Sequence, residues 1–428
     1  MTEPSPAAST ARMSPQGETV RPNAPSVGTW LHWPLRRLLQ RLVRQVACGS
    51  IDVKLPDGQR LSGRGALPGP HAAMVVQRWR TLWRLVLGGD IGLAESYRDG
   101  DWTSPDLPAL LEFGIRNEAA WSGTLDASRP ARWLGRAIHV ARANTRRGSR
   151  QNIAFHYDLG NAFYARWLDP ELIYSSALYT DPAQSLEQAQ ASKLERVAEL
   201  LELDALPVKA RVLEIGCGWG ALALHLAQQH AAHVVGLTLS AQQLAHAQKR
   251  VADAGLSKQV DLRLQDYRDA TGQFDRIVSI EMLEAVGERF WPVYFETLRQ
   301  RLRPGGVAVV QVITIADAHF DKYRRGIDFI QRFIFPGGML PSPGALQTAA
   351  ARAGLVIETD VCFGRDYATT LVEWRSRFVN AWPQIAELGF DNAFRRLWEY
   401  YLCYCEAGFR SGKVDVGLYT LRHSATAV

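Results

Sequence analysis

The fold is decided by the stretch Val-Leu-Glu-Ile-Gly-Cys-Gly-Trp-Gly at residues 212–220. A short apolar run leads into a turn with three glycines, and residues 221–229 then show helical periodicity. Glycines lack the Cβ that would keep a ligand away from the backbone, and a helix N-terminus presents N–H groups to it. The stretch therefore predicts a strand, a turn and a helix that together hold a nucleotide-like cofactor.

The position of the nearest acid distinguishes two kinds of cofactor. Glu214 precedes the first glycine by two residues, whereas a dinucleotide site places its acid at the end of the next strand, on the ribose. That next strand, expected at 233–239, ends in Leu-Thr-Leu-Ser, and the GxGxxG pattern is also absent. A sulfonium cation would be attracted to Glu214 and requires no pyrophosphate contact. The sequence therefore favours S-adenosylmethionine.

Strand and helix patterns alternate from residue 151 onward. Strands are expected at 211–215, 233–239, 260–265, 274–280 and 307–315. This alternation predicts an α/β domain with a doubly wound, mostly parallel sheet. We place the domain at residues 146–428, with an insertion at about 316–343 that covers the carboxyl edge of the sheet, where substrates bind.

The first third of the chain is basic and has a different pattern. Residues 1–150 contain 21 Lys and Arg against 12 Asp and Glu, although the whole chain carries a net charge of only +6. Residues 1–28 are rich in Pro, Ser, Ala and Thr and are expected to be a disordered tail. Residues 29–145 are expected to form a small α+β domain with a hairpin at 51–61, and an arginine-rich linker at 142–150 follows.

One helix in this domain has two interpretations. Its apolar residues share one face and its arginines the other, after Trp30 and Trp33. The apolar residues are Leu35, Leu38, Leu39, Leu42, Val43 and Val46, and the basic residues are Arg36, Arg37, Arg41 and Arg44. The apolar face could pack against its own domain, or it could lie on an anionic membrane. Nucleic-acid binding is not expected, because no zinc-finger, basic-zipper or RNA-recognition pattern is present.

Cysteines and hydropathy exclude other classes of protein. The five cysteines, at 48, 217, 362, 403 and 405, have neither the number nor the spacing of a disulfide framework or a zinc site, so no metal is expected. No apolar run approaches the roughly 20 residues of a membrane span. A reduced cytoplasmic protein is the expectation.

Five further strings resemble one family. They are Phe-His-Tyr-Asp-Leu-Gly-Asn at 155–161, Tyr-Ser-Ser-Ala at 174–177, Gln-Asp-Tyr-Arg at 265–268, Met-Leu-Glu-Ala-Val-Gly at 282–287 and Tyr-Ala-Thr-Thr-Leu at 367–371. Together they resemble the cyclopropane fatty acyl phospholipid synthases and their mycolic acid relatives, over about residues 70–425. The resemblance implies a seven-stranded methyltransferase sheet, S-adenosylmethionine as methyl donor, and the cis double bond of an unsaturated membrane phospholipid as acceptor. It also favours the membrane-binding interpretation of residues 29–145, with transient association at the inner face of the membrane, and is compatible with a homodimer.

The resemblance also implies which residues contact the cofactor. They are Tyr174, Ser175, Glu214, Gly216, Cys217, Gly218, Trp219, Gly220, Thr238, Leu239, Ser240, Gln243, Tyr267 and Arg268. Their chemistry agrees, because Thr238 and Gln243 offer neutral hydrogen-bonding groups to a ribose and Tyr267 offers a flat ring to an adenine. Ser240 is in addition a good helix N-cap.

Ring closure after methyl transfer to an alkene requires a base. The resemblance implies a bound bicarbonate in this role, held by a cysteine, a glutamate, a histidine, an isoleucine and a tyrosine. The corresponding residues here are Ser176, Glu284, Gln311, Ile313 and Tyr367, so that the cysteine and the histidine are replaced. Serine and glutamine can still donate hydrogen bonds to an anion. Replacing Glu284 by Gln is expected to remove most turnover and to spare cofactor binding.

Several alternatives stay open. Cyclopropane formation is the first expectation, but a displaced base would give a methyl- or methylene-branched acyl chain. An N-methyltransferase for a soluble amine and a lipid-binding protein without activity are two further readings. Cys405 matches a cysteine once proposed as a nucleophile in the family, although a buried structural thiol is the better interpretation. Candidates for aromatic stabilisation of a carbocation are Tyr174, Trp167, Tyr323, Phe329, Phe333 and Phe335.

Overall fold

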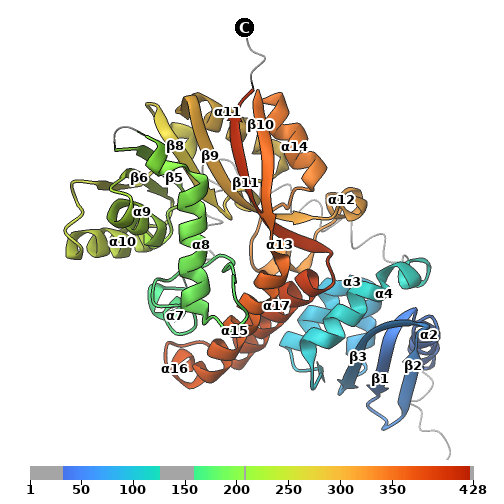
Figure 1. Cartoon of the computed structure of the whole chain (residues 1–428). Helices are drawn as coiled ribbons and strands as arrows, with labels where there is room; N and C mark the ends of the chain where they lie inside the picture. The colour runs from blue at the N-terminus through green and yellow to red at the C-terminus, as the bar shows by residue number, and fades with distance from the viewer. Residues whose placement is uncertain (1–31, 126–158, 207–208, 425–428) are drawn as a thin grey trace, which may run out of the picture.

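The computed structural model describes residues 32–125, 159–206 and 209–424 and shows two domains (Figure 1). The N-terminal domain has a four-stranded sheet of order β2-β1-β3-β4 and, among the described residues, three helices. Its elements are α2 Trp33–Arg44, β1 Cys48–Lys54, β2 Arg60–Arg64, β3 Leu67–Val76, α3 Arg80–Arg98, β4 Trp102–Thr103 and α4 Leu107–Leu125. The expected hairpin is confirmed, because β1 and β2 pair antiparallel. The expected tail, Trp30 and the expected linker lie outside the described residues.

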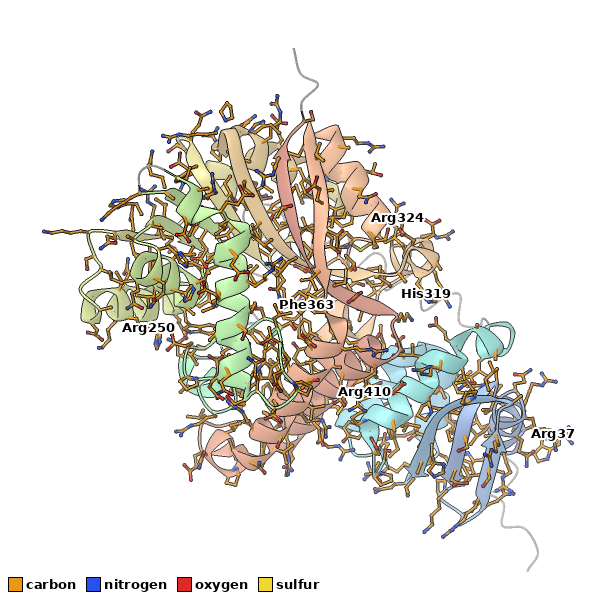
Figure 2. The ribbon with its side chains drawn as sticks, in the orientation of Figure 1. Arg37, Arg250, His319, Arg324, Phe363 and Arg410 are labelled. Atoms are coloured by element: carbon orange, nitrogen blue, oxygen red, sulfur yellow. The ribbon has the colours of Figure 1, made fainter. Side chains whose placement is uncertain are left out.

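Helix α2 turns its apolar face toward its own domain. Its buried residues are Leu35, Leu39, Leu42 and Val43. The exposed side of the helix carries Arg37, Arg41 and Arg44, and Arg37 points away from the domain (Figure 2). The apolar face of this helix therefore packs within the domain, as in the first of the two interpretations, and its exposed side is basic.

The larger domain is built on a seven-stranded sheet of order β10-β11-β9-β8-β5-β6-β7. The strands are β5 Arg211–Ile215, β6 His233–Thr238, β7 Val260–Leu264, β8 Phe274–Ile280, β9 Leu302–Ile315, β10 Leu355–Cys362 and β11 Val414–His423. Neighbouring strands from β7 to β9 are parallel, and β11 is antiparallel to both β9 and β10. The predicted doubly wound, mostly parallel sheet is confirmed. Strand β9 begins earlier than expected, because Leu302 already pairs with Phe274 of β8, and the register then shifts before Val307 pairs with Arg276.

Apolar residues of the strands alternate between the two faces of this sheet. Val212 of β5 and Val278 of β8 contribute to one core, whereas their neighbours Leu213 and Ile277 contribute to the other. The first core is covered by α8 Leu186–Leu200, α9 Ala221–Gln229 and α10 Ala241–Asp253. The second core is covered by α11 Trp291–Arg301 and α14 Pro343–Arg352. With both faces covered, the carboxyl edge of the sheet is the place where a site can open.

Further helices lie at this edge. They are α7 Asn161–Tyr164, α12 Asp317–Tyr323, α13 Phe329–Phe333, α15 Gly364–Asn380, α16 Trp382–Ala386 and α17 Asn392–Arg410. Helices α12 and α13 occupy the segment between β9 and α14, where an insertion is expected. Helix α17 packs against α15 and also against α3 and α4 of the N-terminal domain (Figure 1). No helix in the described part of the chain is both long enough and apolar enough to cross a membrane.

Two lysines of the larger domain join it to the N-terminal domain. Lys322 of α12 and Lys413, just before β11, each form an ion pair with Glu118 of α4, at 2.7 and 2.6 Å. Burial opposes the charge of Glu118, but the two lysines together lower its pKa to about 2. The N-terminal domain is thereby held against the space beside the carboxyl edge of the sheet.

Candidate active site

A cavity of about 1150 Å³ runs along the carboxyl edge of the sheet and continues into the N-terminal domain. One end is lined by the glycine-rich turn after β5 and by the ends of β6 and β8. Residues of α13 and α17, among them Ile330, Tyr401 and Cys405, line the middle, and apolar residues such as Leu42 and Ile51 line the far end. A polar end joined to a long, largely apolar space suits a charged cofactor and a hydrocarbon chain.

The glycine-rich turn has the conformation that its sequence predicts. Gly216, Gly218 and Gly220 have φ angles of 89°, 51° and 86°, which glycine adopts readily. The N–H groups of Gly216 and Cys217 both donate to the Leu237 carbonyl of β6 at 2.9 Å. A Cβ on Gly218 would meet no protein atom within 4 Å, and Gly218 lines the cavity. The turn is therefore fixed to the sheet and leaves room for a ligand.

Glu214 is a buried acid at the end of β5. Its side chain lines the cavity, and its Oε2 atom has no hydrogen-bond partner among the described residues. Burial raises the pKa of Glu214 to about 8. Because a buried carboxylate without a counter-charge is costly, a cationic ligand in the cavity would stabilise its ionised form. Glu214 thus fits the sulfonium cofactor that the sequence favours.

A hydrogen-bond network follows β6. The Thr238 hydroxyl donates to Oε1 of Gln243 at 2.9 Å, and the Ser240 hydroxyl accepts from the Gln243 N–H at 3.3 Å. Ser240 is thus the N-cap of α10, as expected. Thr238, Leu239 and Gln243 line the cavity beside the glycine-rich turn. The network holds neutral polar groups in place for a ribose.

Tyr267 and Arg268 lie next to each other in the chain but are used differently. Tyr267 lines the cavity, and its buried hydroxyl has no hydrogen-bond partner among the described residues. Arg268 instead binds the carboxylate of Asp266 with two hydrogen bonds, Nε to Oδ1 at 2.8 Å and Nη2 to Oδ2 at 2.6 Å. We therefore expect Tyr267 to contact a cofactor and Arg268 to hold the loop that positions Tyr267.

Glu281, directly after β8, lies at the centre of the predicted catalytic residues. Its carboxylate accepts hydrogen bonds from the Ser176 N–H at 2.9 Å, from Nε2 of Gln311 at 2.7 Å and from the Tyr367 hydroxyl at 2.7 Å. These are three of the five positions that the resemblance assigns to a bound anion. Their donors converge on a carboxylate that belongs to the chain itself.

Glu284 lies beside Glu281, in the short 3-10 helix Leu283–Ala285. Its Oε1 atom accepts a hydrogen bond from the Ile313 N–H of β9. Burial, and then the charge of Glu281, raise the pKa of Glu284 to about 8. Burial also raises the pKa of Glu281, but its hydrogen bonds and the positive charge of Lys193 oppose this rise. Two adjacent acids do not ionise together easily. The three hydrogen-bond donors and Lys193 favour the negative charge on Glu281, whereas Glu284, with a pKa of about 8, keeps its proton at neutral pH.

The backbone at Glu281 is strained. Its φ angle is 47°, in the left-handed region that side-chain-bearing residues rarely adopt. This conformation costs about 1–2 kcal/mol for a residue with a Cβ. The surrounding structure maintains the strain and thereby holds the carboxylate among its three donors. Strain of this kind is concentrated at functional positions. Leu172, Glu202 and Ala231 share a positive φ, but among these four residues Glu281 is the one acid that lines the cavity.

Sequence reasoning missed two residues of this site, Glu281 and Lys193. The available signal for Glu281 was a second acid three residues before Glu284, in a chain that also replaces the expected cysteine and histidine. Lys193 of α8 is fully buried, and its Nζ donates to the Ser175 hydroxyl at 2.6 Å. Burial lowers the pKa of Lys193 to about 8. Nothing in the pattern of α8 distinguishes it from an ordinary surface lysine.

Several of the remaining predicted residues also line the cavity, whereas Gly220, Ser240 and Arg268 do not. Tyr174 and Ser175 line it, and the Tyr174 hydroxyl is 2.8 Å from the Tyr401 hydroxyl. Cys405 faces the middle of the cavity, and burial raises the pKa of its thiol well above the usual range. Of the six aromatic candidates, Tyr174, Tyr323 and Phe335 line the cavity. The string at 155–158 lies outside the described residues.

Comparison with known proteins identifies the family. The family model for mycolic acid cyclopropane synthetase matches residues 144–418. The chain belongs to this family. It is 40% identical over 344 residues to the tuberculostearic acid methyltransferase UfaA1 of Mycobacterium tuberculosis, covering 78% of this chain and 79% of the relative. It is 37% identical over 344 residues to the cyclopropane-fatty-acyl-phospholipid synthase of Escherichia coli K12, covering 78% and 83%.

Solved structures of the mycolic acid cyclopropane synthetase family have the same fold. The cyclopropane synthase CmaA1, complexed with SAH and CTAB, matches with a TM-score of 0.58 and 30% identity, covering 64% of this chain and 97% of that chain. MmaA2 from Mycobacterium tuberculosis matches with a TM-score of 0.57 and 29% identity, over 64% and 97%. The chain is accordingly an S-adenosylmethionine-dependent methyltransferase similar to cyclopropane-fatty-acyl-phospholipid synthases. Coclaurine N-methyltransferase shares the fold at 17% identity and a TM-score of 0.56, so the fold alone does not identify the methyl acceptor.

Proposed function

We propose that this enzyme methylates the cis double bond of an unsaturated phospholipid acyl chain and closes a cyclopropane ring, with Glu281 as the base. The observation that carries the proposal is the Glu281 carboxylate, held by Ser176, Gln311 and Tyr367 beside a long apolar cavity. An amine acceptor must also lose a proton, so the base alone does not distinguish the two acceptors, but a soluble amine needs no apolar space that reaches the N-terminal domain. The geometry therefore favours an acyl chain over an amine.

Each residue has a defined task in this mechanism. Glu214, Gly218, Thr238 and Gln243 would hold S-adenosylmethionine, which supplies an electrophilic methyl group and leaves a carbocation on the acyl chain. Glu281 then removes one proton from the added methyl group, and the electron pair of that C–H bond forms the last bond of the ring. Water is kept out by the apolar lining, because it would trap the cation.

A chain carboxylate replaces bicarbonate in this proposal. The Ser176, Gln311 and Tyr367 donors are already engaged by Glu281, and a further anion would lie beside a charged carboxylate. Turnover of purified enzyme should therefore be the same in carbonate-depleted buffer and in buffer with added bicarbonate. A strong dependence on bicarbonate would show instead that an external anion is the base.

A branched acyl product is the second candidate. It is favoured by the 40% identity to a relative named as a tuberculostearic acid methyltransferase. The difference between the products is small in chemical terms. If the ring does not close, the same base can remove a proton next to the carbocation. The electron pair of the broken C–H bond then forms a C=C double bond instead of the last bond of the ring.

Expression in a host with monounsaturated but otherwise unmodified phospholipids tests both candidates. Fatty acids are released from the lipids and analysed by gas chromatography with mass spectrometry. A gain of one CH₂ with loss of the double bond supports the cyclopropane. A gain with retained unsaturation supports the branched product, and an unchanged lipid profile together with a methylated amine would overturn the proposal.

We also propose that the enzyme reaches its lipid by transient binding to the cytoplasmic face of a membrane. The buried apolar face of α2 cannot mediate this contact, but its exposed arginines, Arg37, Arg41 and Arg44, could bind anionic head groups. Flotation with anionic and with neutral vesicles tests this idea. Binding that is unchanged in the triple Arg→Gln variant would exclude α2 as the contact.

A further inference from the structure

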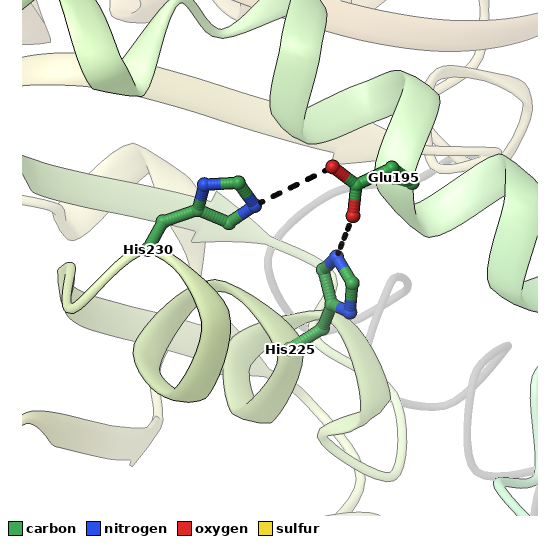
Figure 3. A group of neighbouring side chains, drawn as sticks. All are labelled: Glu195, His225 and His230. Atoms are coloured by element: carbon green, nitrogen blue, oxygen red, sulfur yellow. Dashed lines mark ion pairs between the residues drawn. The ribbon is translucent and has the colours of Figure 1, made fainter.

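Two histidines and a glutamate converge where α8 packs against α9, outside the cavity (Figure 3). Glu195 belongs to α8, His225 lies within α9, and His230 directly follows α9. Nε2 of His225 is 3.3 Å from Oε2 of Glu195, and Nε2 of His230 is 4.0 Å from Oε1. One potential ligand atom from each residue lies within 4.8 Å of the others. Three side chains from two helices thus point at one small volume.

The two imidazole rings are poorly satisfied as they stand. Nε2 of His225 and Nε2 of His230 are buried, and neither makes a hydrogen bond of good geometry among the described residues. The histidine side chains are 18% and 11% exposed, whereas the Glu195 side chain is 51% exposed. Buried polar atoms without partners are uncommon in native proteins and call for an explanation. A ligand that all three residues share would supply the missing interactions.

We propose that Glu195, His225 and His230 bind one divalent transition-metal ion, with Zn²⁺ as the best fit. Nitrogen and carboxylate oxygen atoms bind Zn²⁺ at roughly 2.0–2.2 Å, so ligand atoms around one ion are about 3–4 Å apart. The nitrogen-to-oxygen distances of 3.3 and 4.0 Å, one to each carboxylate oxygen of Glu195, lie in this range. Two imidazoles and one carboxylate leave a coordination position for water, which the exposure of Glu195 permits.

A further acid supports His230 from behind. Oδ1 of Asp204 is 3.6 Å from Nδ1 of His230, on the side of the ring away from Glu195. At this distance the contact is an ion pair rather than a hydrogen bond, and Asp204 would have to approach His230 by a few tenths of an ångström to orient the ring of a metal-bound histidine. The sequence predicts no metal because its cysteines lack the spacing of a zinc site. That argument does not apply to Glu195, His225 and His230, which come together only when α8 packs against α9.

The bound ion would connect the two helices that support the cofactor site. On α8, Gln190 donates to the Ser175 carbonyl at 2.9 Å and Lys193 to the Ser175 hydroxyl at 2.6 Å. The N-terminus of α9 directly follows the glycine-rich turn. An ion between Glu195 and the other end of α9 would therefore fix these two supports relative to each other. Its role is that of a clamp and is independent of the methyl acceptor.

Metal binding is tested on the full chain after removal of metal with a chelator. Isothermal titration with Zn²⁺ and thermal unfolding with and without Zn²⁺ are compared for wild type, His225→Gln, Glu195→Gln and, as a matched control, His246→Gln on the neighbouring α10. We expect one ion per chain and a Tm raised by Zn²⁺ in wild type and in the control. We expect affinity lower by about tenfold or more in the other two variants.

Either of two results would overturn the metal site. One is equal Zn²⁺ affinity in all four proteins, which would place the ion elsewhere, and the other is no saturable binding to wild type. Because Glu195 is half exposed, Glu195→Gln should fold normally even if His225→Gln does not, and its Tm without metal verifies this. None of these readouts requires methyl transfer, so failure of the metal site and failure of the proposed function are distinguishable.

Discussion

The cofactor end and the acceptor end of the cavity differ in how far their structure can be predicted from the sequence. At the cofactor end, the glycine-rich turn and the network around Thr238 and Gln243 have the arrangement that their local sequence predicts. At the acceptor end, the decisive group is Glu281, which no pattern in the sequence distinguishes. The cofactor end is built mainly from the backbone of one continuous stretch. The acceptor end is built from side chains that meet only in the folded protein.

This contrast has a physical basis. A cradle made of backbone depends on φ angles that glycine permits, and glycine is visible in a sequence. A carboxylate held by donors from three distant segments depends on tertiary contacts, and each donor alone is an ordinary polar residue. In the sequence, Ser176, Gln311 and Tyr367 look like an anion-binding site that has lost two of its expected residues. In the folded protein, all three donate hydrogen bonds to the Glu281 carboxylate, which occupies the place of the anion.

Removing the Glu281 carboxylate should have the largest effect. Glu281→Gln keeps the shape of the side chain but cannot accept a proton as a base, and general bases contribute about 10²–10⁴-fold to rate. We expect kcat to fall by about 10³-fold, measured as methyl transfer to lipid vesicles, with the Kd for S-adenosylhomocysteine little changed. Glu288→Gln changes a partly exposed, ion-paired acid in the next turn; this variant is the matched control and should be close to wild type.

Glu281→Gly sharpens the same test. Glycine relieves the strain at a φ of 47°, and this gain offsets part of the cost of leaving three donors without a partner. It also leaves Ser176, Gln311 and Tyr367 free to bind an external anion. Turnover should therefore be lost and then partly restored by bicarbonate or formate, whereas Glu281→Gln should not respond. Wild-type turnover in Glu281→Gln would remove Glu281 from the mechanism.

At the cofactor end, Gly218→Ala should have the second largest effect. The added Cβ points into the open cavity, where a cofactor would lie, and φ is 51°. Gly255→Ala is a matched control, because Gly255 also has a positive φ, 70°, and open space around it, but lies in a turn after α10. Both variants should lose about 1 kcal/mol of stability. Only Gly218→Ala should weaken S-adenosylhomocysteine binding, by about tenfold or more, in calorimetry.

The sequence predicts the parallel sheet and the cofactor cradle well because both follow from periodicity and glycine. It predicts Glu284, Gln311 and Tyr367 at the acceptor end through resemblance, and the structure brings these residues together. It could not predict the charge state of the acid pair, since that depends on burial and on Lys193, a lysine whose position in the core is a tertiary feature. It also left open how α2 is oriented, because an amphipathic pattern does not identify what covers the apolar face.

A pH dependence of stability follows from the buried acids at both ends. The pKa values of Glu214 and Glu284 are both raised to about 8. An acid whose pKa is higher in the folded than in the unfolded state binds more protons when folded. Its contribution to stability is therefore complete below about pH 4.5 and is lost as the pH rises toward about 8. We expect the free energy of unfolding of the cofactor-free protein to fall across this range.

Two single substitutions separate the contributions of the two ends. Glu214→Gln and Glu284→Gln should each reduce the fall in the free energy of unfolding between about pH 4.5 and pH 8. Urea unfolding at several pH values measures this. Glu387→Gln, at an exposed position, is the control and should show the same pH dependence as wild type. Since Glu284 is protonated at neutral pH, its replacement by Gln should lower kcat by only about tenfold, less than the loss for Glu281→Gln. An equal loss for both acids would mean that they act as one unit.

Cys405 provides the smallest expected effect and tests whether the acceptor end contains a nucleophile. Its thiol faces the acyl part of the cavity, and burial keeps its pKa far above neutral pH, so that almost no thiolate forms. Cys405→Ala should therefore change kcat by no more than about threefold, through packing alone. Vesicle-based turnover and resistance to thiol-alkylating reagents are the measurements. A loss as large as that of Glu281→Gln would assign covalent chemistry to Cys405, and the acceptor end would then depend on a thiol as well as on a carboxylate.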